Sequence, residues 1–166
     1  MKNKIEKNIF SENIHKGLSV NEKKAIDVAR KILDVYLEEE HIFKDSCLFG
    51  YEFDCISFDI LYCDNEKTHQ INKEYRNKDY AADIITFAIF ADSEEKFVFD
   101  KEINLGEMII SLDKVEANAK EKQSGFEDEL YFLISHGIMH LLGFDHQTEE
   151  DYNFIMKAQT SALKKL

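Results

Sequence analysis

Three histidines near the end of the chain, His136, His140 and His146, have a spacing that suits metal binding. His136 and His140 are four positions apart, so on a helix their rings project from one face about one turn apart. Two imidazole nitrogens placed in this way can reach one ion, each at roughly 2.0–2.1 Å. Gly143 can end the helix and turn the chain back, which lets His146 return as a third ligand. Three nitrogen ligands leave a fourth tetrahedral position open, as is typical of catalytic zinc.

The alternative is that these histidines are ordinary core or surface residues. The helix that would carry two of them, at about 130–142, is apolar on nearly all sides. A polar ring without a partner in such surroundings costs about 1–3 kcal/mol. Coordination removes that cost, so the three residues together favour a metal site, whereas any one of them alone would not decide.

The spacing is also that of the metzincin proteases, H-E-x-x-H-x-x-G-x-x-H, with one difference. Gly137 occupies the position of the glutamate that serves these proteases as general base. A peptidase of this type needs that carboxylate beside the attacking water, and glycine cannot supply it. The pattern therefore keeps a metal-binding geometry but disfavours proteolysis.

Arg76 is a second candidate functional residue. Of the 21 basic residues only Arg30 and Arg76 are arginines, so an arginine can mark a place that needs a planar, bidentate phosphate ligand. Lys73 and Lys78 lie close to it in sequence and would form a small basic patch. On residue type alone, a surface ion pair is the better interpretation of Arg76.

Three segments resemble one known family. Residues 136–146 resemble the H-G-x-x-H-L-x-G-x-D-H signature of the YbeY family of bacterial metal-dependent endoribonucleases. Residues 71–79 resemble the family's N-x-x-Y-R-x-K-D segment, and residues 106–110 resemble its G-D-I strand. The chain departs from the family by having Ala81-Ala82-Asp83 in place of Pro-Thr-Asp and Glu107 in place of aspartate. These departures affect the positioning of nearby side chains and leave the three histidines of the signature unchanged.

The resemblance implies a compact α+β protein that binds one Zn²⁺ through His136, His140 and His146. It implies cleavage of single-stranded ribosomal RNA, in maturation of the 16S 3′ end and in ribosome quality control, with the small ribosomal subunit and its assembly factors as partners. In the family the arginine that corresponds to Arg76 is implicated in function, which favours a phosphate-binding role over a surface ion pair. Two alternatives stay open: a non-enzymatic, zinc-containing ribosome assembly factor and, with less support, a metzincin-like metalloprotease.

Length and composition limit the remaining choices. The 166 residues suit one domain, and a net charge of −12 disfavours loose binding of nucleic acid without excluding a local basic groove. We expect no DNA partner.

The sequence has no sign of a membrane span or of a secretion signal. No apolar run reaches the roughly 18 residues of a membrane span, and residues 1–7 lack the apolar core of a signal peptide, so we expect a cytoplasmic protein without a membrane partner. Three cysteines without a Cys-x-x-Cys pair predict free thiols.

The order of apolar patterns predicts an α+β domain over residues 1–166, with a small mixed sheet of about four strands and helices packed on it. Residues 1–18 form either an edge strand or a loose tail. Strands are expected at 51–63, where the apolar phase switches and suggests a bulge or burial on both faces, and at 84–91 and 105–112, joined by a hairpin loop.

Helices are predicted at about 20–40, 64–75, 112–121 and 125–142, followed by a last amphipathic helix. Asp64 and Thr148 are expected N-caps, and Ser124 with Glu127 matches a capping box before the central, histidine-bearing helix. Gly143 is expected to end that helix in a left-handed conformation.

Overall fold

The computed structural model describes residues 4–166, so the first three residues of the predicted N-terminal segment lie outside it. Its sheet has the strand order β1-β2-β4-β3. Three strands run parallel, β1 (Glu6–Asn13), β2 (Cys55–Cys63) and β4 (Glu102–Ser111), and β3 (Ile84–Phe87) runs antiparallel to β4. The α+β class with a mixed four-stranded sheet is thus confirmed. Within the predicted segment 1–18 the described residues form an edge strand, β1.

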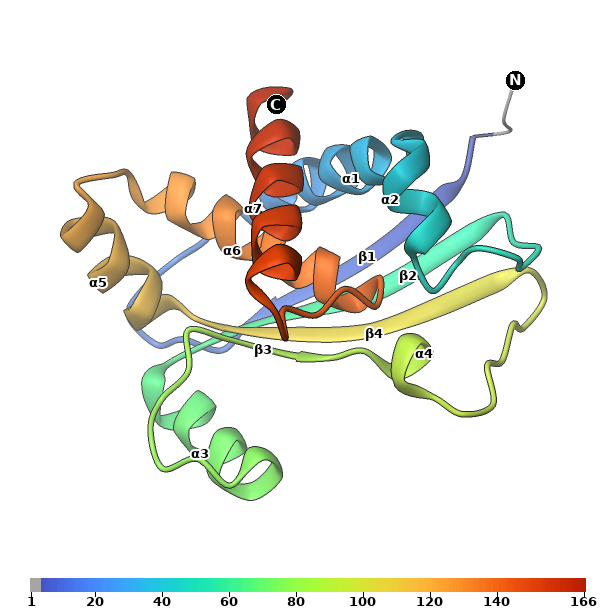
Figure 1. The fold of residues 1–166 in the computed structure, drawn as a ribbon. Coiled ribbons are helices and arrows are strands. Elements are labelled where there is room, and N and C mark those ends of the chain that lie inside the picture. Colours follow the sequence, from blue (N-terminus) through green and yellow to red (C-terminus); the bar gives the residue numbers. More distant parts are fainter. Residues whose placement is uncertain (1–3) are drawn as a thin grey trace.

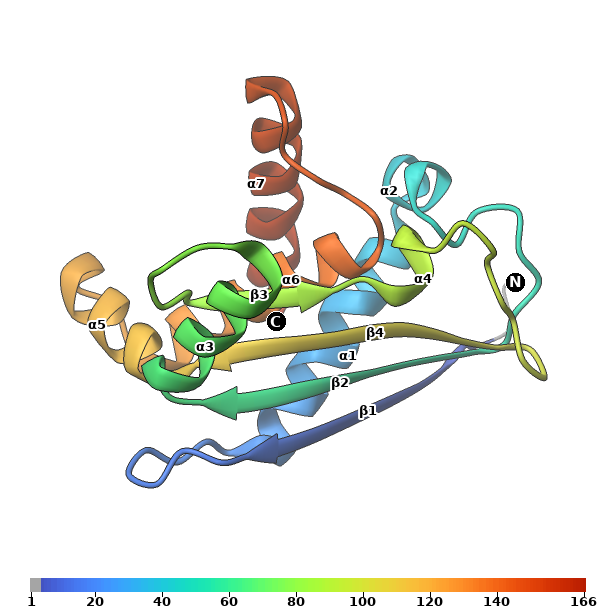
Figure 2. The same ribbon diagram turned by 90° about the horizontal axis from the view of Figure 1, so that it is seen from below.

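Helices cover the two faces of the sheet unequally. In the described part of the chain they are α1 (Glu22–Glu38), α2 (Glu40–Asp45), α3 (Asn65–Arg76), α4 (Ile89–Asp92), α5 (Leu112–Lys122), α6 (Phe126–Leu141) and α7 (Glu149–Lys164). Figure 1 shows α1, α6 and α7 on one side of the sheet and α3 on the other. Seen from below in Figure 2, α3 lies across the end of the sheet where β2 and β4 finish. Within residues 4–166, no helix has the length and apolarity needed to cross a bilayer.

The main core lies between the sheet and α6. One row of side chains from the sheet, including Phe58, Ile60 and Met108, packs against the apolar residues of α1 and α6. A separate small cluster beneath α3 contains Ile71 and Ile85. Because α6 is buried on most sides, as its all-round apolar sequence predicts, it forms a rigid support for any side chain that it carries.

Gly137 marks the closest approach of α6 to the sheet. A Cβ atom at this position would lie 2.9 Å from Cδ1 of Ile84 and 3.0 Å from Cε of Met108. Contacts that short require neighbouring atoms to move, so glycine permits the helix to pack this near to β3 and β4. The consequence is that His136, one residue earlier, is held close to the end of the sheet.

Three of the predicted helix ends are confirmed. The side chain of Asp64 accepts a hydrogen bond from the backbone N of Lys67 at 2.9 Å, and Thr148 Oγ1 accepts one from the backbone N of Asp151 at 3.1 Å. Gly143 has φ +98°, and the backbone N of Phe144 donates to the carbonyl of Met139. This hydrogen bond ends α6 in the way that is typical of a left-handed glycine just beyond a helix C-terminus.

The predicted capping box at Ser124 is wrong. The N-cap of α6 is Gly125, and Ser124 instead donates its backbone N–H to the carbonyl of Ala119 at 2.9 Å. That bond closes the end of α5, where Gln123 adopts a left-handed conformation with φ 56°. Because the backbone N–H of Ser124 is already bonded to Ala119 of α5, it is not available for the side chain of Glu127, as a capping box would need. Glu127 pairs with Lys24 of α1 rather than with Ser124.

Two predicted strands also differ from the structure. The strand expected at 51–63 begins only at Cys55, and its pairing with β4 shifts between Ser57 and Phe58. These residues pair with Asn104 and Gly106, so the extra residue of the bulge is Leu105, in β4.

The strand expected at 84–91 ends at Phe87 and is followed by the short helix α4, because a short apolar run does not by itself distinguish strand from helix. The predicted helix at 20–40 likewise ends at Glu38, and the chain bends at Glu39 into a second short helix, α2. β3 and β4 do pair antiparallel, but the hairpin loop expected at 92–102 joins α4 to β4, because α4 lies between the two strands.

Candidate metal centre

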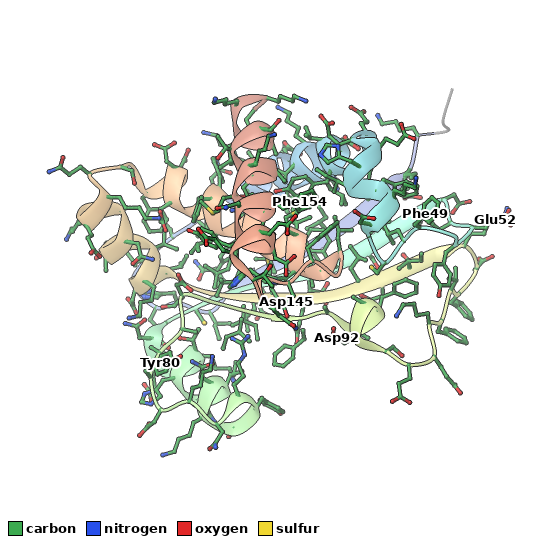
Figure 3. All side chains as sticks on the ribbon, viewed as in Figure 1. Phe49, Glu52, Tyr80, Asp92, Asp145 and Phe154 are labelled. Atoms are coloured by element: carbon green, nitrogen blue, oxygen red, sulfur yellow. The ribbon has the colours of Figure 1, made fainter. Side chains whose placement is uncertain are left out.

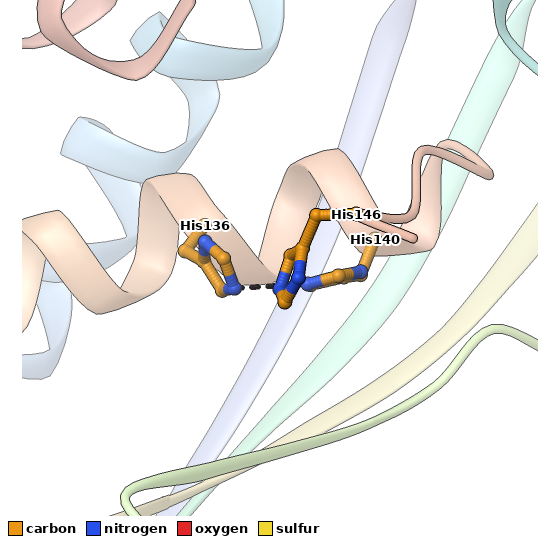
Figure 4. Close-up of side chains that lie close together, drawn as sticks. All are labelled: His136, His140 and His146. Atoms are coloured by element: carbon orange, nitrogen blue, oxygen red, sulfur yellow. Dashed lines mark hydrogen bonds between the residues drawn. The ribbon is translucent and has the colours of Figure 1, made fainter. Parts of the chain in front are cut away.

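The structure brings the three predicted histidines together. His136 and His140 project from α6, and His146 lies on the loop between α6 and α7 (Figure 4). One ring nitrogen from each lies within 4.8 Å of the others, and the Nε2 atoms of His136 and His140 are 2.9 Å apart. The spacing of four on the helix and the turn at Gly143 produce this cluster, as the sequence predicted. It could hold a metal ion.

His136 is oriented by a buried glutamine of α7. Oε1 of Gln159 lies 3.1 Å from Nδ1 of His136, and the Gln159 side chain is fully buried. Its amide nitrogen donates to Oγ of Ser135 at 3.0 Å and to the carbonyl of Phe132 at 3.3 Å. Since both amide hydrogens are used there, Oε1 faces His136 as an acceptor and Nδ1 carries the proton. The lone pair on Nε2 therefore points into the histidine cluster.

Gln159 was missed in the sequence, although a signal for it existed. It lies among Ile155, Ala158 and Ala162, which form the buried face of α7. A glutamine at helical spacing on an apolar face needs polar partners within the core, because an unpaired buried amide is costly. The sequence pattern thus marks Gln159 as unusual, but the identity of its partner depends on how α7 packs on α6.

Burial keeps the two helix-borne histidines neutral. Loss of solvent lowers the pKa of His136 below its usual value, against the opposing effect of the hydrogen bond to Gln159. Burial, followed by the proximity of His136 and His146, lowers the pKa of His140 to about 4. At neutral pH both rings are therefore in the form that binds a metal ion. The donor set thus fits an ion such as zinc, which accepts three nitrogens in tetrahedral sites.

The histidines line a cavity of about 400 Å³ that Arg76 also lines. Arg76 is the last residue of α3 and is exposed, and within residues 4–166 it forms no hydrogen bond or ion pair. Its guanidinium is thus free to bind a ligand. Three carboxylates, Asp83, Asp92 and Asp145, line the same cavity, and Figure 3 labels the last two.

Asp145 shapes the turn rather than orienting an imidazole. Its Oδ1 accepts a hydrogen bond from the backbone N of His146 at 2.8 Å, and its Oδ2 accepts one from Nε2 of Gln147 at 3.3 Å. These bonds lower the pKa of Asp145, the one from Gln147 most. The hydrogen bonds of Asp145 therefore serve the turn that leads to His146.

Glu107 and the cysteines take no part in the cluster. Glu107 lines a different cavity, beneath α3 on the opposite side of the sheet. The three cysteines are free, as predicted. Burial raises the pKa of each thiol, which leaves them protonated and unsuited to metal binding at neutral pH.

Comparison with known proteins identifies the family. The family description "Endoribonuclease YbeY" matches residues 10–166. The endoribonuclease YbeY of Acetivibrio thermocellus is 33% identical over 166 residues, which cover 95% of this chain and 96% of the relative. That of Malacoplasma penetrans is 41% identical over 109 residues, which cover 66% of this chain and 69% of the relative.

A protein from Thermotoga maritima, whose structure was solved in solution, superimposes with a TM-score of 0.55 at 21% identity. The match covers 96% of this chain and 90% of that one, and it supports the fold alone. The family match and the full-length relative together decide the assignment: the chain belongs to the endoribonuclease YbeY family.

Proposed function

We propose that this protein is a metal-dependent endoribonuclease that cuts single-stranded ribosomal RNA. The observation that carries the proposal is one cavity in which three imidazole nitrogens lie beside an unpaired arginine. Family membership points to the same activity, because the relatives are named endoribonucleases. A metal-binding group beside a phosphate-binding group is a combination suited to the cleavage of a phosphodiester.

In this proposal His136, His140 and His146 hold one zinc ion. Three neutral nitrogens suit zinc, and the cavity leaves room for water or substrate at a further position. Zinc bound there would supply Lewis-acid chemistry at a phosphoryl oxygen. The chain's own contribution is to present the histidines in one tautomer, which for His136 is imposed by Gln159.

Arg76 in turn binds the charge of the scissile phosphate. Its guanidinium can form two parallel hydrogen bonds to a phosphate, and no carboxylate of the described residues competes for it through an ion pair. The net charge of −12 repels RNA elsewhere on the surface, so binding of naked RNA is expected to be weak and to depend steeply on salt. We therefore infer that the small ribosomal subunit and its assembly factors supply part of the docking surface, in 16S 3′-end maturation and ribosome quality control in the cytoplasm.

The two alternatives have less support. A metzincin-like protease needs a carboxylate as general base at position 137, where this chain has glycine. A purely structural zinc clip is usually a closed, four-ligand site, whereas this cluster lines an open cavity of about 400 Å³.

The decisive experiment compares metal-stripped and zinc-reconstituted protein on a single-stranded RNA substrate. We expect cleavage to disappear with the metal and to return with it, and we expect about one zinc per chain by elemental analysis. Casein and peptides should remain intact under the same conditions. Zinc-dependent peptide cleavage, or a reconstituted sample that fails to cut RNA, would overturn the proposal.

A further inference from the structure

A second cavity, of about 350 Å³, adjoins the metal centre. It shares Arg76, Asp83 and Ile84 with the first cavity, so these residues form a common wall between the two. Its other walls come from the end of α3, from the loop that joins α3 to β3, and from α5. A ligand held at Arg76 can therefore extend from one cavity into the other.

The second cavity is lined by an excess of positive charge. Arg76, Lys78 and Lys114 line it, against the single carboxylate of Asp83. In the part of the chain that the structure describes, none of the three cations forms a hydrogen bond or an ion pair through its side chain. On a protein with a net charge of −12, three unpaired cations around one cavity predict a ligand that carries negative charge.

The same cavity also offers an aromatic ring and amide groups. Tyr80, on the loop between α3 and β3 (Figure 3), is 57% exposed. Asn72 is 1% exposed, and its Nδ2 donates to the carbonyl of Tyr80 at 2.9 Å. Oδ1 of Asn72 is buried and has no hydrogen-bond partner among the described residues. Asn118 of α5 adds a second amide that is also without a partner there.

We propose that this second cavity binds one unstacked nucleotide of a single-stranded RNA, next to the linkage whose phosphate is held at Arg76. The inference rests on the proposed function and extends it by placing a neighbouring nucleotide. Lys78 and Lys114 face the flanking phosphate, the ring of Tyr80 stacks on the base, and the amide of Asn118 meets the polar edge of the base. Proteins that bind single strands combine these same elements, a cationic groove, a stacking ring and hydrogen-bonding groups.

The size of the cavity explains why the strand must be single. About 350 Å³ lies at the lower end of the range for small-molecule sites, which is room for one nucleotide and not for a base pair. A base within a duplex is stacked and paired, so it cannot enter without the loss of those interactions. The preference for single-stranded RNA then follows from this cavity rather than from the metal centre.

A matched pair of lysines on α5 tests the charge. Lys114→Gln removes a cation from the cavity, whereas Lys120→Gln makes the same change at an exposed position that lines neither cavity. We would measure binding of a labelled single-stranded RNA 10-mer to the zinc-loaded protein by stopped-flow anisotropy, before cleavage occurs, over a range of salt. Lys114→Gln should reduce the slope of log Kd against log salt by about 0.7, the value for one phosphate contact on a single strand. Lys120→Gln should leave the slope unchanged.

Substitutions of Tyr80 test stacking. Tyr80→Ala should weaken binding of the 10-mer by about 5- to 100-fold and should raise KM more than it lowers kcat, whereas Tyr80→Phe should bind like the wild type. A duplex of the same sequence should bind equally to all three proteins. If adenosine monophosphate bound as tightly as the 10-mer and lost its affinity in Tyr80→Ala, the cavity would be a site for free nucleotides and the inference would fail.

These measurements distinguish a failure of the nucleotide subsite from a failure of the proposed nuclease function. If the wild type cuts RNA while Lys114→Gln and Tyr80→Ala match it in Kd, KM and salt slope, the subsite is wrong and the nuclease assignment stands. If the wild type binds the 10-mer in a Tyr80-dependent manner but does not cut it, the nuclease assignment is wrong and the subsite stands. Circular dichroism melts of the variants guard against loss of folding, which is not expected at exposed positions such as Tyr80.

Discussion

The candidate metal centre has two unequal halves. His136 and His140 lie on the buried helix α6, and a fully buried glutamine orients the first of them. His146 lies on an exposed loop, where Asp145 contacts its backbone and no side chain of the described residues hydrogen-bonds its ring. A side chain already ordered by packing binds a ligand without further loss of conformational entropy, while a loop side chain must be ordered on binding. Three chemically identical ligands are therefore expected to contribute unequally.

Removal of a helix-borne ligand should have the largest effect. We expect His140→Ala to bring zinc content well below one per chain and to abolish RNA cleavage, because the remaining helix ligand and the loop ligand hold the ion poorly. His146→Ala should retain more zinc, since the ordered pair remains. Elemental analysis after dialysis against a weak chelator measures the difference. Equal zinc retention in His140→Ala and His146→Ala would show that the two halves do not differ. A full complement of zinc in a His136→Ala/His140→Ala double variant would refute the assignment of the metal site.

Loss of Arg76 should reduce catalysis without loss of metal, because it belongs to neither half of the cluster. Arg76→Ala is expected to lower kcat by about 10²- to 10³-fold, the usual effect of removing a group that stabilises transition-state charge. Arg76→Lys keeps the charge but loses the planar fork, so it should fall between the alanine variant and the wild type. Zinc content and melting temperature should stay at wild-type values. Cleavage rates that are unchanged in both variants would show that Arg76 is a surface residue with no role in catalysis.

Substitutions of Gln159 test whether its hydrogen bond to His136 is what orders the histidine pair on α6. Gln159→Leu should weaken zinc binding by about 10- to 100-fold, because His136 loses the acceptor that fixes its tautomer. Gln159→Glu keeps an acceptor for His136 but loses the amide hydrogen bonds to Ser135 and Phe132, so its affinity should fall between those of the leucine variant and the wild type. Competition with a fluorescent zinc chelator provides the measurement. A leucine variant with wild-type affinity would mean that packing alone orients His136.

The smallest expected effect concerns pH. The pKa of His140 is about 4 in the folded protein and near 6.5 in an unfolded chain, so between these values the unfolded state binds the extra proton. The metal-free protein should therefore lose stability as the pH falls from about 6.5 towards 4. Thermal melts of metal-free wild type and His140→Ala across this range should show a shallower decline in the variant. Parallel curves would contradict the role of burial at His140.

Local patterns in the sequence were sufficient for the parts of the site that depend on one helix and its end. The spacing of His136 and His140, the apolar sequence of α6 and the stop at Gly143 are properties of neighbouring residues, and the structure shows each as expected. The caps at Asp64 and Thr148 belong to the same class. Such features follow from backbone geometry within a few residues.

Features that depend on packing between distant segments were not predictable. The contact between His136 and Gln159 joins residues that are 23 positions apart, and the sequence alone could not show that α7 packs against α6 at this point. The error at Ser124 arose in the same way, because the preceding helix had already used its backbone N–H. Arg76 was singled out by its residue type and favoured as a functional residue only through the family resemblance, whereas its place beside the histidines depends on how α3 meets the end of the sheet.

The absence of a side chain at Gly137 has a consequence for the evolution of this metal site. A peptidase with the same histidine spacing differs from this protein by one residue in the motif, which suggests that a single substitution could convert one activity into the other. A Cβ atom at position 137 would lie 2.9 Å from Cδ1 of Ile84 and 3.0 Å from Cε of Met108, so both of these atoms would have to shift. Each is the end of a flexible side chain, and neither contact is to the backbone, so a small shift could accommodate the Cβ. The missing carboxylate at position 137, more than a lack of space for it, therefore separates this site from that of a peptidase with nearly the same metal-binding motif.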